Sequence, residues 1–412
     1  MLEKTKVSVE GSVGMAARHA LAWWVFGNLA GLWLSLLLMW PSLQNGLPTY
    51  GRWIPVHLNV QLYGWTSLPL IAWLLSIYEV DRSKAGAWAP AAIWGWTTAL
   101  AAGVFQWLHG TTSGKIFLDW NSGAFWAFLL AQAILWHVLA SAWNERSCGW
   151  SPPRRRWSFA GLAGLLLVPV SLAITCSPAS YPPVDSTTGG PTGSSLMGST
   201  LIVIGLALIL PRVTSLPGKG GVGPWKWFFY LFSWGTFIIT EWMGGTHHDP
   251  AQIGAMSLLL PWIWILPKDW SGYVWPAGSR PWRLALFGWW ALLVFSGWLM
   301  YEPWLLDSIK FTQALVAHSH MAMAGFTTSF CMLLLALLTK RRIGSPVTVA
   351  VWNVAALLMV VVLAFAGWKE GGGYAWMAEM PTWRFGCFRE RMIFGTVMSA
   401  VSLIWFGKWK SS

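Results

Sequence analysis

Five of the eight histidines in this chain have positions suited to binding a metal. They are His57, the adjacent pair His247 and His248, and the H-S-H pair His318 and His320. All five fall at the same end of long apolar segments, where an ionisable side chain is costly and generally serves a function. Neutral imidazole binds heme iron, copper and non-heme iron. Five imidazoles at one level therefore predict a metal or heme site inside a helical bundle.

The spacing of these histidines indicates how they divide among ligands. His318 and His320 are two residues apart, so their side chains leave a helix about 200° apart and can serve two hemes. His57 approaches from the same level and is a candidate for the opposite axial position of one heme. His247 and His248 end a helix, where both rings can converge on one metal. The other three histidines are interpreted as structural or supporting groups: His19, His109 and His137.

Long apolar segments carry these residues. The chain has 412 residues, of which 55% are hydrophobic and 10% are charged, a composition far from that of soluble domains. Crossing a bilayer takes about 20 apolar residues. Twelve windows of this kind lie near 19–42, 55–79, 86–107, 121–143, 157–178, 193–213, 226–246, 250–267, 282–305, 312–339, 346–368 and 391–408. We expect an all-α polytopic membrane protein of about twelve helices, with a single transmembrane domain over residues 1–412.

The net charge of +12 is explained by membrane orientation and does not indicate nucleic acid as a partner. In the twelve-helix arrangement, most of the 27 Lys and Arg residues fall on one side of the bilayer. The positive-inside rule makes that side cytoplasmic and places both termini there. The 36 tryptophans are interpreted as residues of the membrane interface and of helix ends. We expect an integral protein of a bacterial inner (cytoplasmic) membrane.

The windows and the histidine pattern together resemble subunit I of the heme-copper oxidase superfamily over nearly the whole chain. That family has an axial histidine on helix II, an adjacent pair ending helix VII, and H-x-H on helix X. The segments "PVHLNVQLYGW" and "EWMGGTHHDP" look most like the branch of the cbb-type oxygen reductases and nitric oxide reductases. The resemblance implies that His57 and His320 ligate a low-spin heme b and that His318 ligates a second, high-spin heme. It also implies that His247 and His248 hold copper or non-heme iron.

One departure from the family pattern concerns the second metal. The family has a third histidine on helix VI, where this chain reads "SSLMGSTLIVIG" and Ser199 stands in its place. The metal would then need Asp249, Glu241 or water as a further ligand. Glu241 lies two helical turns before His248 and is alternatively a proton donor. Asp249 precedes Pro250 and suits a helix cap equally well.

A second departure concerns tyrosine. Oxygen-reducing members place a redox-active tyrosine beside the copper, whereas helix VI has none here and Tyr230 falls near the cytoplasmic end of helix VII. This difference favours a divergent nitric oxide reductase, which converts two NO, two electrons and two protons into N2O and water. A cytochrome c oxidase-type oxygen reductase is one alternative. The others are a noncatalytic heme-b electron-transfer subunit with a decayed metal site, and a transporter whose histidines carry protons.

Heme propionates and electrons also need partners. The segment "KEGGGYAWMAEMPTWRFGCFRERM" offers Arg384, Arg389 and Arg391, and arginine pairs bidentately with carboxylates; an ordinary solvated loop is the alternative. No C-x-x-C-H motif for attaching heme c is present. We therefore expect electrons to arrive from a cytochrome c or a heme-c subunit on the outer face, with other membrane subunits beside the chain.

Overall fold

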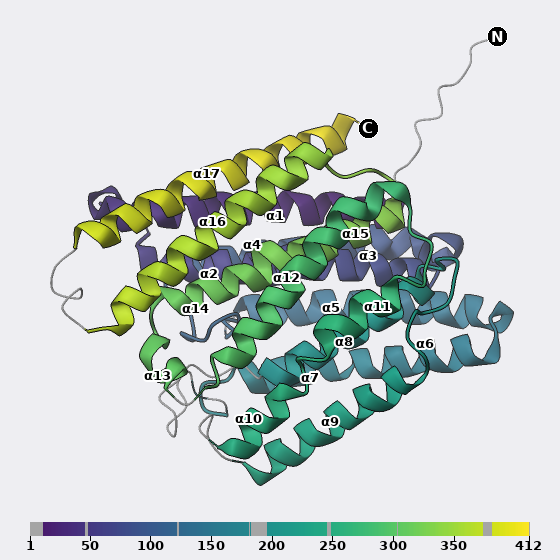
Figure 1. The fold of residues 1–412 in the computed structure, drawn as a ribbon. Helices are drawn as coiled ribbons and strands as arrows, with labels where there is room; N and C mark the ends of the chain where they lie inside the picture. The colour runs from purple at the N-terminus through teal and green to yellow at the C-terminus, as the bar shows by residue number, and fades with distance from the viewer. Residues whose placement is uncertain are drawn as a thin grey trace.

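The computed structural model describes residues 11–45, 48–121, 123–180, 182, 196–244, 249–302, 304–373 and 381–411. The long helices of these residues lie beside one another in one bundle (Figure 1). The α-helices are α1 (Ser12–Met39), α2 (Tyr50–Asn59), α3 (Ser67–Ile77), α4 (Ala89–Leu108), α5 (Gly123–Arg146), α6 (Pro152–Leu165), α7 (Leu167–Cys176), α8 (Leu196–Val213), α9 (Trp225–Met243), α10 (Pro250–Ser257), α11 (Trp262–Trp270), α12 (Arg280–Leu299), α13 (Leu305–Ile309), α14 (Gln313–His320), α15 (Thr328–Thr339), α16 (Pro346–Gly371) and α17 (Thr382–Ser411).

Nine helical segments of the described chain are long and apolar enough to cross a membrane. Their apolar side chains also face outward: on α7, Leu167, Val170 and Ile174 are 65%, 56% and 54% exposed. Lipid accommodates such a surface, whereas water does not. The prediction of an all-helical polytopic membrane protein in a bilayer is therefore confirmed. The windows near 86–107, 193–213 and 226–246 form helices α4, α8 and α9, which are not among the nine, so the count of twelve spans stays a prediction.

A cluster of tryptophans fills the centre of the bundle. The ring of Trp24 on α1 lies 5.0 Å from that of Trp65, 4.7 Å from Trp352 and 5.5 Å from Trp405, measured between centroids. All four side chains are at most 2% exposed. Such aromatic contacts stabilise a core beyond the burial of their area alone. Interface positions therefore do not account for all tryptophans in this chain.

The two helices that carry His57 and His320 are each followed by a π-helical segment. After α2 the chain forms a π-helical segment, η2 (Val60–Thr66), and after α14 another, η7 (Met321–Thr327). Hydroxyl groups accommodate the wider turns, since Thr66 donates to the carbonyl of Gln61 and Thr328 to that of Met323, each five residues earlier. Short π-helical segments inside α-helices are frequent at functional sites.

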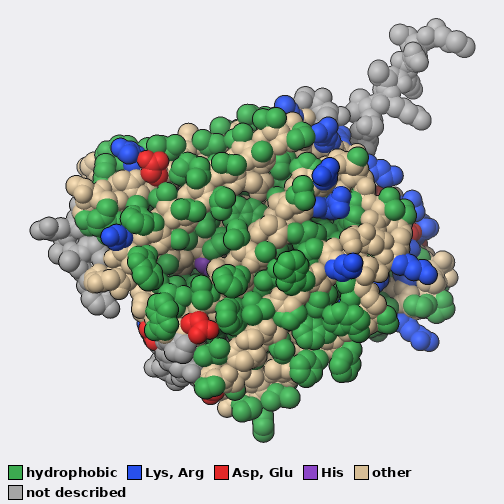
Figure 2. Space-filling model, in the orientation of Figure 1, with side chains coloured by type: hydrophobic (Ala, Val, Ile, Leu, Met, Phe, Trp, Pro, Cys, Tyr) green, Lys and Arg blue, Asp and Glu red, His purple; other side chains and the backbone are tan. Residues whose placement is uncertain are grey.

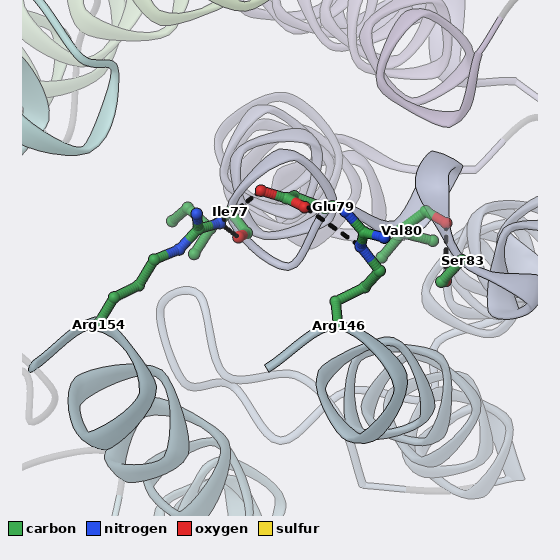
Figure 3. A network of polar contacts seen from close by, with 6 residues as sticks. All are labelled: Ile77, Glu79, Val80, Ser83, Arg146 and Arg154. Carbon is green, nitrogen blue, oxygen red and sulfur yellow. Dashed lines mark hydrogen bonds and ion pairs between the residues drawn. The ribbon is translucent and has the colours of Figure 1, made fainter. Parts of the chain in front are cut away.

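Lys and Arg side chains gather toward one end of the bundle, at the right in Figure 2, where α5 ends and α6 begins. We call it the basic end. There Glu79 lies between two arginines (Figure 3): its carboxylate oxygens are 3.1 Å from Arg146 Nη2 and 2.9 Å from Arg154 Nη2. Arg154 also donates to the carbonyl of Ile77 at 2.9 Å. One carboxylate therefore joins the ends of α3, α5 and α6.

Replacing Glu79 with Gln is expected to lower the free energy of unfolding by about 1 kcal/mol, because half-exposed ion pairs contribute little each. The two arginines are 38% and 42% exposed at their side chains, so 1 M salt should remove most of the difference. Thermal unfolding in detergent at low and high salt measures both effects. Glu390→Gln breaks the exposed pair with Arg389 and is the control; an equal loss in that variant would contradict a role for the Glu79 network.

Candidate cofactor site

A cavity between α1, α2, α14, α16 and α17 is lined by two of the predicted ligands, His57 and His320. The empty space between its lining atoms, counted out to where it opens to solvent, is about 750 Å³. Most of the remaining wall is apolar or small. It includes Trp24, Gly31, Leu58, Met323, Trp352 and Met398. The lining of the cavity therefore suits a largely apolar molecule.

His57 is oriented by a bond to the backbone of α1. Its Nδ1 lies 2.8 Å from the carbonyl oxygen of Gly27, and because a carbonyl only accepts, Nδ1 carries the proton. The lone pair of Nε2 is then free to bind a metal, as in most metal-binding histidines. Gly31 permits the close approach, since a Cβ at that position would lie 2.7 Å from Cε1 of His57.

His320 has the same arrangement on its own helix. Its Nδ1 lies 2.7 Å from the carbonyl oxygen of Val316, one turn earlier, so this nitrogen is also the donor and Nε2 keeps its lone pair. Both rings line the same cavity. Two neutral imidazoles with available Nε2 atoms on one cavity are the donor set that a six-coordinate heme iron requires.

Arg391 of α17 lines the same cavity and is only 6% exposed. Its Nη1 is 3.4 Å from Oε1 of Gln313, and no carboxylate among the described residues forms an ion pair with it. A buried cation without an anionic partner is costly. Ser399 lies eight residues further along α17 and also lines the cavity, which therefore extends about 12 Å along the helix from a cationic end to an uncharged one.

His318 is placed away from this cavity, against α12. Its Nδ1 lies 3.2 Å from the hydroxyl oxygen of Ser296. A Cβ at Gly297 would lie 3.4 Å from Cε1 of His318, so the ring rests directly on the helix. The two histidines of the H-S-H sequence thus have different surroundings, His320 in the cavity and His318 beside α12.

The predicted second-metal site is described only in part, because His247 and His248 lie outside the described residues. Asp249 caps α10, and its Oδ1 accepts from the backbone nitrogen of Ala251 at 2.9 Å. Glu241 and Ser199 are exposed on α9 and α8. In the part of the chain that the structure describes, no three His, Cys, Asp or Glu side chains are placed to hold a metal ion.

The other two predicted propionate partners lie elsewhere. The Nε atom of Arg384 is 2.9 Å from Oε1 of Glu370, whose side chain is 1% exposed. Arg389 is 58% exposed at its side chain and pairs with the neighbouring Glu390 at 3.2 Å. Neither arginine lines the cavity. Of the three arginines, Arg391 is the one that lines the cavity with the two histidines, and it has contacts with Gln313 and Tyr50 but no ion pair with a described carboxylate.

Several polar residues near the cavity escaped the sequence analysis. Gln61 donates to Oδ1 of Asn28 at 3.2 Å, and both line the cavity; Nδ2 of Asn28 is buried without a partner in the structure. Amides inside apolar windows are themselves a signal of function. In the loop after α4, Asp119 accepts from Asn59 at 2.9 Å, and burial raises the pKa of Asp119 against the lowering effect of its hydrogen bonds.

A tyrosine is also influenced by Glu241, one of the groups predicted for the second-metal site. Tyr301 follows α12 one turn beyond Gly297 and interacts electrostatically with Glu241. Burial raises the pKa of the Tyr301 hydroxyl to about 12, and the Glu241 carboxylate adds to the effect. No pattern in the sequence groups these two residues, because Tyr301 belongs to neither helix VI nor helix VII of the resemblance.

The arrangement was compared with known proteins. No protein-family model matches the chain, and no curated protein sequence matches it. The geometry of the cavity therefore carries the functional argument.

Proposed function

We propose that this chain is a membrane oxidoreductase subunit that binds a low-spin heme b between His57 and His320. The observation that supports the proposal is that two histidines line one cavity while the Nδ1 of each is bound to a backbone carbonyl, which leaves the Nε2 of each to accept or to bind a metal. Arg391 supplies the positive charge that a heme propionate needs. The bound heme would supply one-electron transfer.

The residues around the cavity have separate tasks in this proposal. Gly27 and Gly31 orient the ring of His57, and Val316 orients that of His320. Trp24 and Trp352 line the cavity and would shield the porphyrin edge from water. The orphaned Nδ2 of Asn28 is available to a polar substituent or a water molecule.

We further propose that His318 would hold a second, high-spin heme and that His247 and His248 would hold a non-heme iron, which together would supply the chemistry for reducing NO to N2O. Glu241 would bring protons, because it is exposed at the end of α9 that precedes these histidines. Oxygen reduction is the second candidate. Tyr301, whose pKa the Glu241 carboxylate helps to raise, favours it, since oxygen chemistry can draw on a phenolic hydrogen.

The same proposal orients the chain in a bacterial inner membrane. By the positive-inside rule the basic end faces the cytoplasm, and α1 begins and α17 ends at that end (Figure 1). The cavity histidines then lie toward the outer face. A cytochrome c or a heme-c subunit on that face is the proposed electron donor, and other membrane subunits would cover part of the apolar surface.

The purified protein is expected to contain two hemes and one further iron per chain. Its reduced spectrum should combine a low-spin band that CO leaves unchanged with a high-spin component that CO shifts. Heme extraction, iron and copper analysis, and spectra with and without CO measure these quantities. N2O production from NO tests the reaction, with oxygen consumption as the comparison.

Three other results are informative. One CO-insensitive heme and no second metal would identify an electron-transfer subunit instead of a reductase. Copper in place of the extra iron, with oxygen consumption, would favour the second candidate. A protein that binds no heme at all would overturn the proposal and leave a transporter as the remaining hypothesis.

A further inference from the structure

A second cavity lies at the basic end, away from the two-histidine cavity. It is formed by the segment between α8 and α9 together with the turn that follows α11, and its empty volume is about 970 Å³. Arg212, Lys219, Trp227 and Tyr273 are among its lining residues. Nothing in the proposed electron transfer uses it.

The loop that forms this cavity is held in place by backbone contacts. Gly218 has a φ of +113°, which favours glycine, and it bridges to Tyr273. The amide of Lys219 donates to the carbonyl of Gly272 at 3.1 Å, and that of Gly221 donates to the carbonyl of Asp269 at 2.9 Å. The cavity is therefore preformed and does not depend on a ligand for its shape.

The charges of the cavity favour an anion. Beneath the loop, Lys226 pairs with Asp269, and their side chains are 2% and 0% exposed, so this pair is internally neutral. Arg212 and Lys219 are exposed and form no ion pair with any described carboxylate. Arg212 is oriented by the carbonyl of Leu208 at 2.9 Å and lies 5.3 Å from the ring of Trp227. Besides the paired Lys226, two positive charges without an ion-pair partner among the described residues thus line the cavity, and no acidic side chain lines it.

The apolar surface beside these charges indicates the kind of anion. Trp225 and Phe228 in the first turn of α9 are 54% and 75% exposed, and Val213 at the end of α8 is 39% exposed. A soluble phosphate would gain nothing from such neighbours, whereas a phospholipid could lay its acyl chains along them. Basic pockets between transmembrane helices on the cytoplasmic side bind anionic lipids in this way.

We propose that this cavity binds the phosphate headgroup of an anionic phospholipid. Arg212 and Lys219 contact the phosphate, and the acyl chains lie along Trp225 and Phe228. The site lies at the basic end of the bundle, where the headgroups of the inner leaflet are reached if that end is cytoplasmic. The proposal is independent of the heme assignment, since none of its residues lines the other cavity.

Native mass spectrometry of the delipidated full chain in detergent tests it, with phosphatidylglycerol and phosphatidylcholine as probes. The wild type should retain phosphatidylglycerol preferentially. Arg212→Ala with Lys219→Ala should weaken this binding by on the order of tenfold or more, given about 1 kcal/mol per basic residue. Arg82→Ala with Arg156→Ala removes the same charge from exposed positions of the basic end and should change it less than twofold. If the double variant does not fold, Lys219→Glu alone, in the exposed loop, should also weaken phosphatidylglycerol binding.

Three outcomes would overturn the assignment. Equal retention of phosphatidylcholine would show that the site does not select a negatively charged lipid. An equal loss of phosphatidylglycerol binding in the Arg82 and Arg156 variant would indicate a general effect of surface charge. Millimolar inorganic pyrophosphate is the third arm. It should leave the bound lipid in place, and displacement at that concentration would make the cavity a site for a soluble phosphate compound.

Discussion

Replacing either His57 or His320 with Ala is expected to abolish the low-spin optical spectrum of the bound heme. Both rings line one cavity, and each has Nε2 left to bind a metal because Nδ1 donates to the carbonyl of Gly27 or Val316. Loss of one axial ligand leaves the iron five-coordinate, so the remaining heme should become high-spin and bind CO. Reduced spectra with and without CO, together with heme content per chain, measure the change.

Two controls separate ligation from misfolding. His109→Ala is matched to His320→Ala, since Nδ1 of His109 also lies 2.7 Å from a carbonyl one turn earlier but its side chain is exposed outside the cavity; it should keep the spectrum. Added imidazole should restore the low-spin band in the His57 and His320 variants, because it can fill the space that the side chain left. Retention of a full low-spin spectrum by both variants would refute the ligand assignment.

His318→Ala should leave the low-spin band unchanged, because this ring lies against Ser296 and Gly297 of α12 and not in the cavity. The sequence predicted this separation from spacing alone, since two residues on a helix leave it about 200° apart. The same reasoning predicted the helices, because long apolar windows have few alternatives in a bilayer. Sequence patterns were therefore most informative where one helix decides the geometry.

The sequence was less informative where several helices meet. From the sequence, three arginines of one segment were equally good candidates for a propionate partner. The packing of α17 on α1 and α16 places Arg391 in the cavity and leaves Arg384 and Arg389 outside it. No short sequence motif predicts the π-helical segments η2 and η7. Asn28 and Gln61 went unnoticed because an amide in an apolar window is a weaker pattern than a histidine pair. Tertiary contacts decided each of these points.

Replacing Arg391 with Met is expected to weaken heme retention and to lower the midpoint potential of the low-spin heme. Arg391 is a buried cation at one end of the cavity, without an ion-pair partner among the described residues. A positive charge favours the reduced heme, which carries one charge less than the oxidised heme. Removing an interaction difference of about 1.4 kcal/mol would lower a one-electron potential by roughly 60 mV. Spectroelectrochemical titration measures the shift.

The stability of the heme-free chain is a second test, because there the loss of Arg391 should not be harmful. A buried charge without a partner destabilises a fold, so Arg391→Met should leave the heme-free chain at least as stable as the wild type while the heme-loaded chain loses affinity for its cofactor. Arg389→Met removes the same charge from an exposed position that pairs with Glu390 and should change neither quantity. If the midpoint potential falls equally in both variants, the shift comes from surface charge in general and Arg391 is not a propionate partner. If the heme-free Arg391 variant unfolds more easily than the wild type, the guanidinium stabilises the fold through its protein neighbours.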